Sequence, residues 1–169
     1  VCDTAIMVLK SAEGVEVGSE VSGKFVNEFG LPSSIIINKV DNEHSTFDET
    51  LKKAKQRLTN GAIAVTFPIT QGVTFNAVVD VLKMKAYTYG EAGTKKVTES
   101  DIPAELKSKA EEYRTELIEK IAETDEALMN KYFEEGSLSD TDIEKGLKSA
   151  IIGRSLSPVF AVSSTKAVG

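Results

Sequence analysis

Short apolar runs alternate with amphipathic stretches at the start of the chain, and this alternation constrains the fold more than any other feature. Residues 5–9 are continuously apolar, and residues 34–38 contain three consecutive isoleucines. Such runs are typical of strands buried on both faces of a parallel sheet. Between them, four apolar residues recur at every fourth position: Val17, Val21, Phe25 and Phe29. This spacing predicts an amphipathic helix, and a second helix is predicted over residues 46–58. The order strand, helix, strand, helix predicts an α/β fold with a parallel sheet.

The pattern changes after Asn60 and Gly61. Residues 62–69 and 78–89 are predicted as strands that pair antiparallel around a turn. Three helices follow from Pro103, the third opened by Ser139 and Asp142, which resemble a capping box. A last apolar strand, residues 158–162, returns to the parallel sheet. We therefore expect a domain formed by residues 1–60 and 157–169, with an inserted α+β subdomain over residues 61–156.

Composition narrows the classes of function. No apolar run approaches the ~18 residues that a membrane helix needs, which excludes membrane spanning. The 20 Lys and Arg against 26 Asp and Glu give a net charge of −6, so the chain as a whole does not attract DNA or anionic lipid. The single cysteine, Cys2, excludes an internal disulfide and favours a cytoplasmic location. Because the chain opens at Val1 and enters a strand almost at once, we expect a fragment of a longer protein.

One motif is a decoy. Gly18, Gly23 and Lys24 match the spacing of the phosphate-binding loop G-x-x-x-x-G-K-[ST]. Phe25 stands where that loop needs a hydroxyl to hold magnesium, and the helical period runs through the segment. We therefore predict a helix here rather than a phosphate loop.

The segment Asn38-Lys39-Val40-Asp41 lies at the carboxyl end of the second predicted strand, where open α/β sheets bind ligands. One carboxylate can accept both donors of guanine, the ring N–H and the exocyclic amine, in a bidentate pair. Adenine would leave Asp41 desolvated and unpaired. Lys39 would lie along the base, and Asn38 would tie the loop to neighbouring backbone. The alternative is a polar loop whose Asn and Asp serve turn formation alone.

A second polar segment, Ser163-Ser164-Thr165, follows the last predicted strand. Its small residues allow a backbone N–H to approach the guanine carbonyl oxygen. Taken alone, this segment is equally typical of a helix N-cap. Because both segments follow strands of one parallel sheet, we expect them to meet at the same edge.

These segments together resemble the GTP-binding domain of elongation factor G and its elongation factor G-like homologues over essentially the whole chain. Residues 3–17 resemble the strand and loop after that family's switch two, and residues 38–41 resemble its guanine-specificity motif. Residues 80–87, 102–106 and 126–132 resemble the subdomain that the family inserts before the last strand. The resemblance implies the C-terminal half of a P-loop GTPase-type domain. Its implied nucleotide ligands are Asn38, Lys39, Asp41, Ser163, Ser164 and Thr165.

The resemblance also implies which parts of the GTPase are missing from these residues. The phosphate loop, both switches and the histidine that positions water lie upstream of Asp3 in the family. The intact parent would bind GTP or GDP with magnesium and hydrolyse GTP on the ribosome, whereas this chain has no magnesium ligands or catalytic residues and is expected to be inactive. Ser164 and Thr165 depart from the family's usual Ala and Leu or Phe. His44 matches no catalytic histidine and is expected to be a solvated loop residue.

Acidic residues concentrate in the predicted helices after Pro103. From there to Glu135, ten acidic and five basic residues give −5 of the total −6. A solvated helix face is one interpretation. The resemblance implies another, docking of the ribosomal stalk protein on one helix face: Glu112, Glu116, Glu119 and Glu123. Two other hypotheses remain open, a protein-interaction module with vestigial nucleotide segments and a ribosomal protection or release factor.

Overall fold

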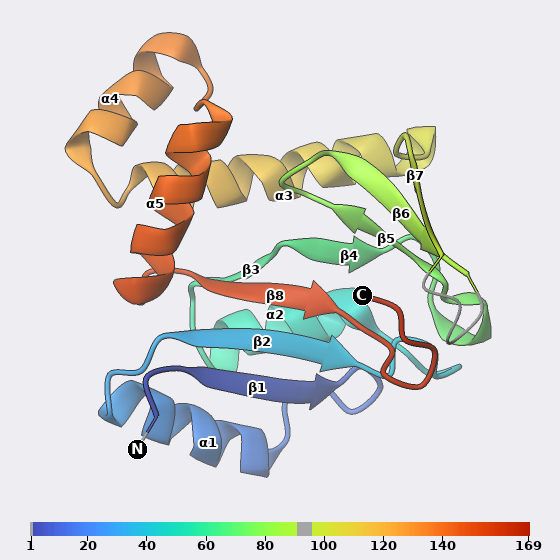
Figure 1. Cartoon of the computed structure of the whole chain (residues 1–169). Helices are drawn as coiled ribbons and strands as arrows, with labels where there is room; N and C mark the ends of the chain where they lie inside the picture. The colour runs from blue at the N-terminus through green and yellow to red at the C-terminus, as the bar shows by residue number, and fades with distance from the viewer. Residues whose placement is uncertain (1, 91–95) are drawn as a thin grey trace.

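The computed structural model describes residues 2–90 and 96–169, which form two sheets and their covering helices (Figure 1). The first sheet is parallel, in the order β1 (Ala5–Lys10), β2 (Ser33–Asn38), β8 (Ser157–Ala161) and β3 (Ala62–Ala64). The second is antiparallel, in the order β4 (Thr66–Pro68), β5 (Ala77–Asp80), β6 (Lys85–Tyr89) and β7 (Val97–Ser100). The helices are α1 (Val17–Glu28), α2 (Phe47–Arg57), α3 (Ala104–Ala122), α4 (Glu126–Glu135) and α5 (Asp140–Ile152), with a 3-10 turn η1 (Gly72–Thr74). The predicted α/β class with a parallel sheet is confirmed.

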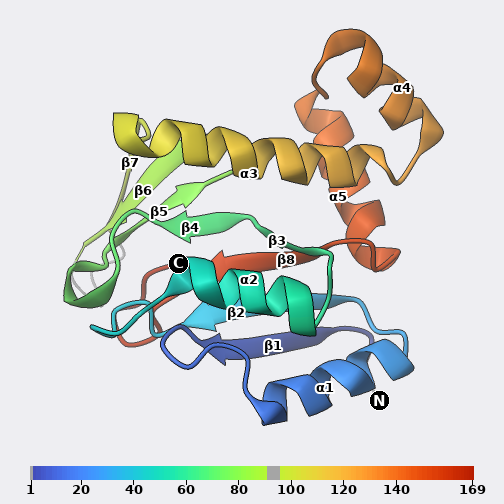
Figure 2. The same ribbon diagram turned by 180° about the vertical axis from the view of Figure 1, so that it is seen from behind.

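Helices α1 and α2 lie on the same face of the first sheet, as Figure 2 shows. Met7 and Leu9 of β1 point to that face and are buried. Ile6 and Val8 point to the opposite face and are 64% and 58% exposed. The prediction that this strand is buried on both faces is therefore wrong. β1 is an edge strand of the described sheet, and its second face is open.

The apolar stripe of α1 also points to solvent. Val17 is 75% exposed and Phe29 is 69% exposed, and Phe25 stacks on Phe29 with ring centroids 6.4 Å apart. The helix instead packs on the sheet through Gly23 and Val26. A Cβ at Gly23 would lie 3.1 Å from Leu58 Cδ2, so the absence of a side chain there lets α1 approach the end of α2. The segment is helical, which confirms that the phosphate-loop match is a decoy.

The predicted strand over residues 62–69 is divided between the two sheets. Residues 62–64 pair with β8 in the parallel sheet, and residues 66–68 pair with β5 in the antiparallel one. Val65 lies at the crossing, where its N–H donates to Val159 O at 2.9 Å and its carbonyl accepts from Val81 N at 2.9 Å. β3 therefore belongs to the first sheet, although the sequence places it in the insertion.

The predicted strand over residues 78–89 is a hairpin. β5 and β6 pair antiparallel around residues 81–84, where Met84 has a positive φ of 52° and Asp80 Oδ1 accepts from Lys83 N at 2.9 Å. The predicted antiparallel pairing of β4 with β5 is confirmed. The sequence does not predict β7, because its four residues show no apolar alternation. All four are exposed in the structure.

The three predicted helices after Pro103 are confirmed. α3 packs beside the second sheet, and α4 and α5 form a hairpin that packs against α3, with α5 leading into β8 (Figure 1). Ser139 caps α5 as predicted, since its Oγ accepts from Asp142 N at 3.2 Å. In residues 2–90 and 96–169, no helix is long and apolar enough to cross a bilayer.

Candidate functional site: two loops at the carboxyl end of the parallel sheet

The two predicted recognition segments follow neighbouring parallel strands. β2 and β8 pair with Ile37 opposite Ala161, so Asn38 and Val162 leave the sheet side by side. Val162 N donates to Ile37 O at 2.9 Å, and Val40 N donates to Val162 O at 3.3 Å. The hydrogen-bond ladder thus continues past the strand ends into the two loops.

Asn38 and Ser164 join the loops through their side chains and backbone. Asn38 Oδ1 accepts from Ser164 N at 3.1 Å and from Lys39 N at 2.7 Å. Its Nδ2 donates to Ser164 Oγ at 3.1 Å. Asn38 therefore holds the backbone of both loops, and the amide satisfies donors on each side.

Asp41 carries the feature that most directly indicates a ligand. Its Oδ1 is buried, and no hydrogen-bond partner reaches it from the residues that the structure describes. Lys39 lies two residues before Asp41 and has a positive φ of 59°, which is uncommon for a residue with a side chain. A buried carboxylate oxygen without a donor is costly, so a structure that retains one points to a ligand that donates to it.

The loop after β8 is built around Ser163, which is fully buried. Ser163 pairs with Val168 through two backbone hydrogen bonds of 2.9 and 3.1 Å, and its Oγ accepts from Lys166 N at 3.1 Å. Ser164 and Thr165 lie exposed at the tip of this closed loop. The Ser163 side chain is used in shaping the loop, and the N–H and Oγ of Ser164 are engaged by Asn38, whereas Thr165 is exposed.

Lys166 is a residue of this loop that the sequence reasoning missed. Its ammonium donates to two backbone carbonyls in the β4–β5 connection, those of Val73 and Phe75, the latter at 3.3 Å. A lysine next to the polar residues of this loop gives no sequence signal for the contact, because the acceptors lie more than 90 residues away in the chain.

The chemistry of these residues fits a guanine base. The Asp41 carboxylate presents acceptors for the two adjacent donors of guanine, and adenine lacks the matching amine. The loop of Ser164 and Thr165 places small side chains next to Asn38, whose Oδ1 accepts from the Ser164 N–H. Within the described parts of the chain, no cluster of three His, Cys, Asp or Glu side chains is arranged to hold a metal ion.

The remaining candidates lie elsewhere. His44 is 80% exposed in the loop after Asp41, 3.4 Å from Glu43, as expected for a solvated residue. Of the four glutamates on α3 and its end, Glu116 pairs with Lys55 of α2 at 2.5 Å and Glu123 pairs with Lys120 at 2.5 Å. Glu112 and Glu119 are exposed.

The parallel sheet, its helices and the two loops at its carboxyl end have the architecture of a GTPase-type α/β domain. The family model of the elongation factor Tu GTP-binding domain matches residues 1–169, and the chain belongs to this family of translational GTPases. A crystal structure of a protein from Thermus thermophilus is similar, with a TM-score of 0.87 and 27% sequence identity. The match covers 99% of this chain and 24% of that one, so this chain spans about a quarter of that protein's length.

Proposed function

We propose that this chain supplies the guanine-recognition part of the GTP site in a ribosome-associated translational GTPase of the elongation factor G type. The single observation that carries the proposal is the buried, unpartnered Oδ1 of Asp41 beside the Asn38–Ser164 junction. In this proposal Asp41 accepts from the base, Lys39 lies along it, and the Ser164 and Thr165 backbone approaches its carbonyl oxygen. Ser163 shapes the loop. The parent acts in the cytoplasm, with magnesium held by groups outside these residues.

GTP hydrolysis is assigned to the parent and not to these 169 residues. Phosphoryl transfer depends on a phosphate loop, a metal ion and a positioned water. The decoy motif at Gly18 lies in α1, so it cannot cradle phosphates with backbone N–H groups. Base contacts alone give an affinity of about 1 mM, because a few hydrogen bonds must offset the cost of association.

The test is an amide chemical-shift titration of the chain with GDP, ADP and xanthosine diphosphate. We expect GDP to bind at about millimolar concentration and to shift the amides of residues 38–41 and 163–165, with ADP at least about tenfold weaker. Asp41→Asn should lose GDP and gain xanthosine diphosphate, because an amide donates to the carbonyl that replaces the guanine amine. Asp140→Asn removes the same charge from an exposed residue of α5 and is the matched control. Equal base preference in wild type and Asp41→Asn would refute the proposal.

A second function rests on the acidic surface of α3. We propose that this surface docks the ribosomal stalk protein. The surface belongs to the inserted unit, which in this proposal runs from the crossing at Val65 to residue 156. Glu112 and Glu119 are seven residues apart on an exposed face, and they are the groups available for docking. Glu116 and Glu123 neighbour them but are engaged by lysines. Glu112→Lys with Glu119→Lys should abolish salt-sensitive stalk binding and leave GDP shifts unchanged. Stalk binding that survives the double reversal would exclude this face.

A protein-interaction module with vestigial nucleotide loops is the remaining alternative. It predicts stalk binding with no base preference in the GDP, ADP and xanthosine diphosphate titrations. The buried Asp41 Oδ1 favours the nucleotide function over this alternative, because an unpaired buried oxygen is costly unless a ligand donates to it.

A further inference from the structure

One short segment of the β4–β5 connection contacts both recognition loops. We call residues 71–75 the bracket segment. Gly72 N donates to Val40 O at 2.9 Å, in the loop that carries Asp41. The Val73 and Phe75 carbonyls accept from the Lys166 ammonium, in the loop that carries Ser164. The bracket segment connects two strands of the second sheet, yet its polar groups reach the carboxyl end of the first.

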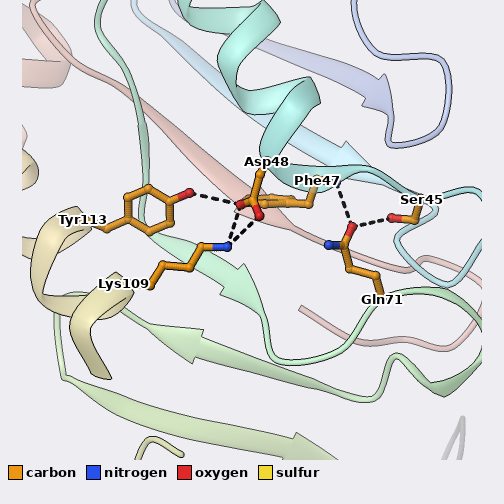
Figure 3. Close-up of polar contacts among 6 residues, drawn as sticks. All are labelled: Ser45, Phe47, Asp48, Gln71, Lys109 and Tyr113. Atoms are coloured by element: carbon orange, nitrogen blue, oxygen red, sulfur yellow. Dashed lines mark hydrogen bonds and ion pairs between the residues drawn. The ribbon is translucent and has the colours of Figure 1, made fainter. Parts of the chain in front are cut away.

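Gln71, the first residue of the bracket segment, contacts the far end of the Asp41 loop. Its Oε1 accepts from Phe47 N at 2.8 Å and from Ser45 Oγ at 3.0 Å, as Figure 3 shows. Thr46, at the N-cap of α2, makes no side-chain capping bond. Gln71 therefore caps α2 from another part of the chain and satisfies an N–H that would otherwise lack a helical partner. The loop over residues 39–46 is thus held near both ends, at Val40 and at Ser45.

The bracket segment is itself well anchored. Phe75 is fully buried in the core, and Phe75 N donates to Gly72 O at 2.9 Å to close the 3-10 turn. Thr70 Oγ1 donates to Thr74 O at 3.2 Å across the same turn. Gly72 has a φ of 76°, a conformation that a residue with a Cβ adopts only with strain. A connection anchored by a buried side chain and by its own turn therefore contacts two loops that have no regular secondary structure.

We infer that the bracket segment sets the spacing of the two guanine-recognition loops, and that Gln71 and Lys166 are positioning residues for base recognition. The inference rests on the proposed function of Asp41. Lys39 holds a left-handed backbone conformation one residue before Val40, and such a conformation persists only where surrounding contacts determine it. Loops that are ordered before binding lose less entropy on binding, so loss of the bracket weakens guanine recognition without removing any group that touches the base.

The test compares deletion and rescue variants of the chain in the titrations with GDP and ADP. We expect Lys166→Met and Gln71→Ala to weaken GDP binding about three- to tenfold, as loss of one or two hydrogen bonds would, with ADP unchanged. The selectivity ratio therefore falls, which a change in stability alone does not cause. Lys166→Arg and Gln71→Glu keep the donor or the acceptor and should restore the ratio. Lys131→Met, which removes a lysine that bonds Asp142 in the α4–α5 hairpin, is the control.

The outcomes separate this inference from the proposed function. If Asp41→Asn changes the base preference while both deletion variants keep the wild-type GDP to ADP ratio, the bracket has no positioning role. If wild type itself shows no base preference, the proposed function fails first. Gln71 is exposed, so we expect the Gln71→Ala variant to fold. This variant provides the measurement if Lys166→Met loses the dispersed amide spectrum of a folded chain.

Discussion

The Tyr113 hydroxyl in α3 donates to Asp48 Oδ1 in the first turn of α2 at 3.1 Å, and the same oxygen accepts from the Lys109 ammonium at 2.7 Å (Figure 3). The Tyr113 ring also packs edge-on against Phe67 of β4, with centroids 5.4 Å apart. Burial raises the pKa of the Tyr113 hydroxyl, and the negative charge and hydrogen bond of Asp48 raise it further. The Tyr113 side chain thus couples α3 to α2, the helix that follows the Asp41 loop.

The raised pKa of Tyr113 predicts a loss of stability at alkaline pH. An unfolded tyrosine titrates at about pH 10, and the folded chain holds this proton more tightly. The stabilisation is therefore complete below about pH 10 and is lost as the pH rises above that value. Urea unfolding at a series of pH values from about 8 to 11 should show the decline. Tyr113→Phe keeps the ring and removes the titrating proton, so its free energy of unfolding should fall less steeply with pH. Lysine titration contributes equally to both proteins and does not affect the comparison. Parallel curves would contradict the assignment.

Two phenylalanines test which side of α1 and α2 faces the core. Phe47 is fully buried at the start of α2, so Phe47→Ala should lower the free energy of unfolding by about 3–5 kcal/mol. Phe29 is 69% exposed, so Phe29→Ser should change it by less than about 0.5 kcal/mol. Urea denaturation of both variants measures the difference. A large loss for Phe29→Ser would show that the α1 stripe packs against the rest of the chain.

The sequence predicts the order of elements well but not which face of each is buried. The four-residue spacing at Val21 and Phe25 correctly indicates a helix, because the period depends on local geometry. Burial depends on what packs against the helix, and here Gly23 and Val26 occupy the contact with the sheet. Likewise the apolar run of β1 indicates a strand but does not reveal that Ile6 and Val8 lie on an open face.

The candidate site divides in the same way. Asn38, Asp41 and Ser164 can be picked out from the sequence, since all three lie at or within three residues of the carboxyl end of a predicted strand of one parallel sheet. Gln71 and Lys166 cannot, because their partners lie 24 and 91–93 residues away in the chain. Their roles depend on how the second sheet sits at the end of the first, which no local pattern encodes.

The Lys55–Glu116 pair predicts a modest, salt-dependent coupling between α2 and α3. The ammonium contacts both carboxylate oxygens, at 2.5 and 2.7 Å, and the two side chains are 28% and 38% exposed. A double-mutant cycle with Lys55→Met and Glu116→Gln should give a coupling of about 0.5–1 kcal/mol in low salt, because water still screens the pair. Raising the salt to about 1 M should reduce it. Coupling that is unaffected by salt would argue against a solvent-accessible ion pair.

Two helical glycines should respond to alanine in opposite directions. A Cβ at Gly146 in α5 would overlap Ile121 Cγ2 and would lie 2.9 Å from Leu128 Cδ1, at the junction of α3, α4 and α5. The close approach of α5 requires this missing side chain, so Gly146→Ala should destabilise by about 1–3 kcal/mol despite its better helix propensity. A Cβ at Gly18 in α1 meets nothing within 4 Å, so Gly18→Ala should stabilise by up to about 1 kcal/mol. Urea midpoints measured side by side give the signs, and a stabilising Gly146→Ala would mean that α5 does not pack on Ile121 as described.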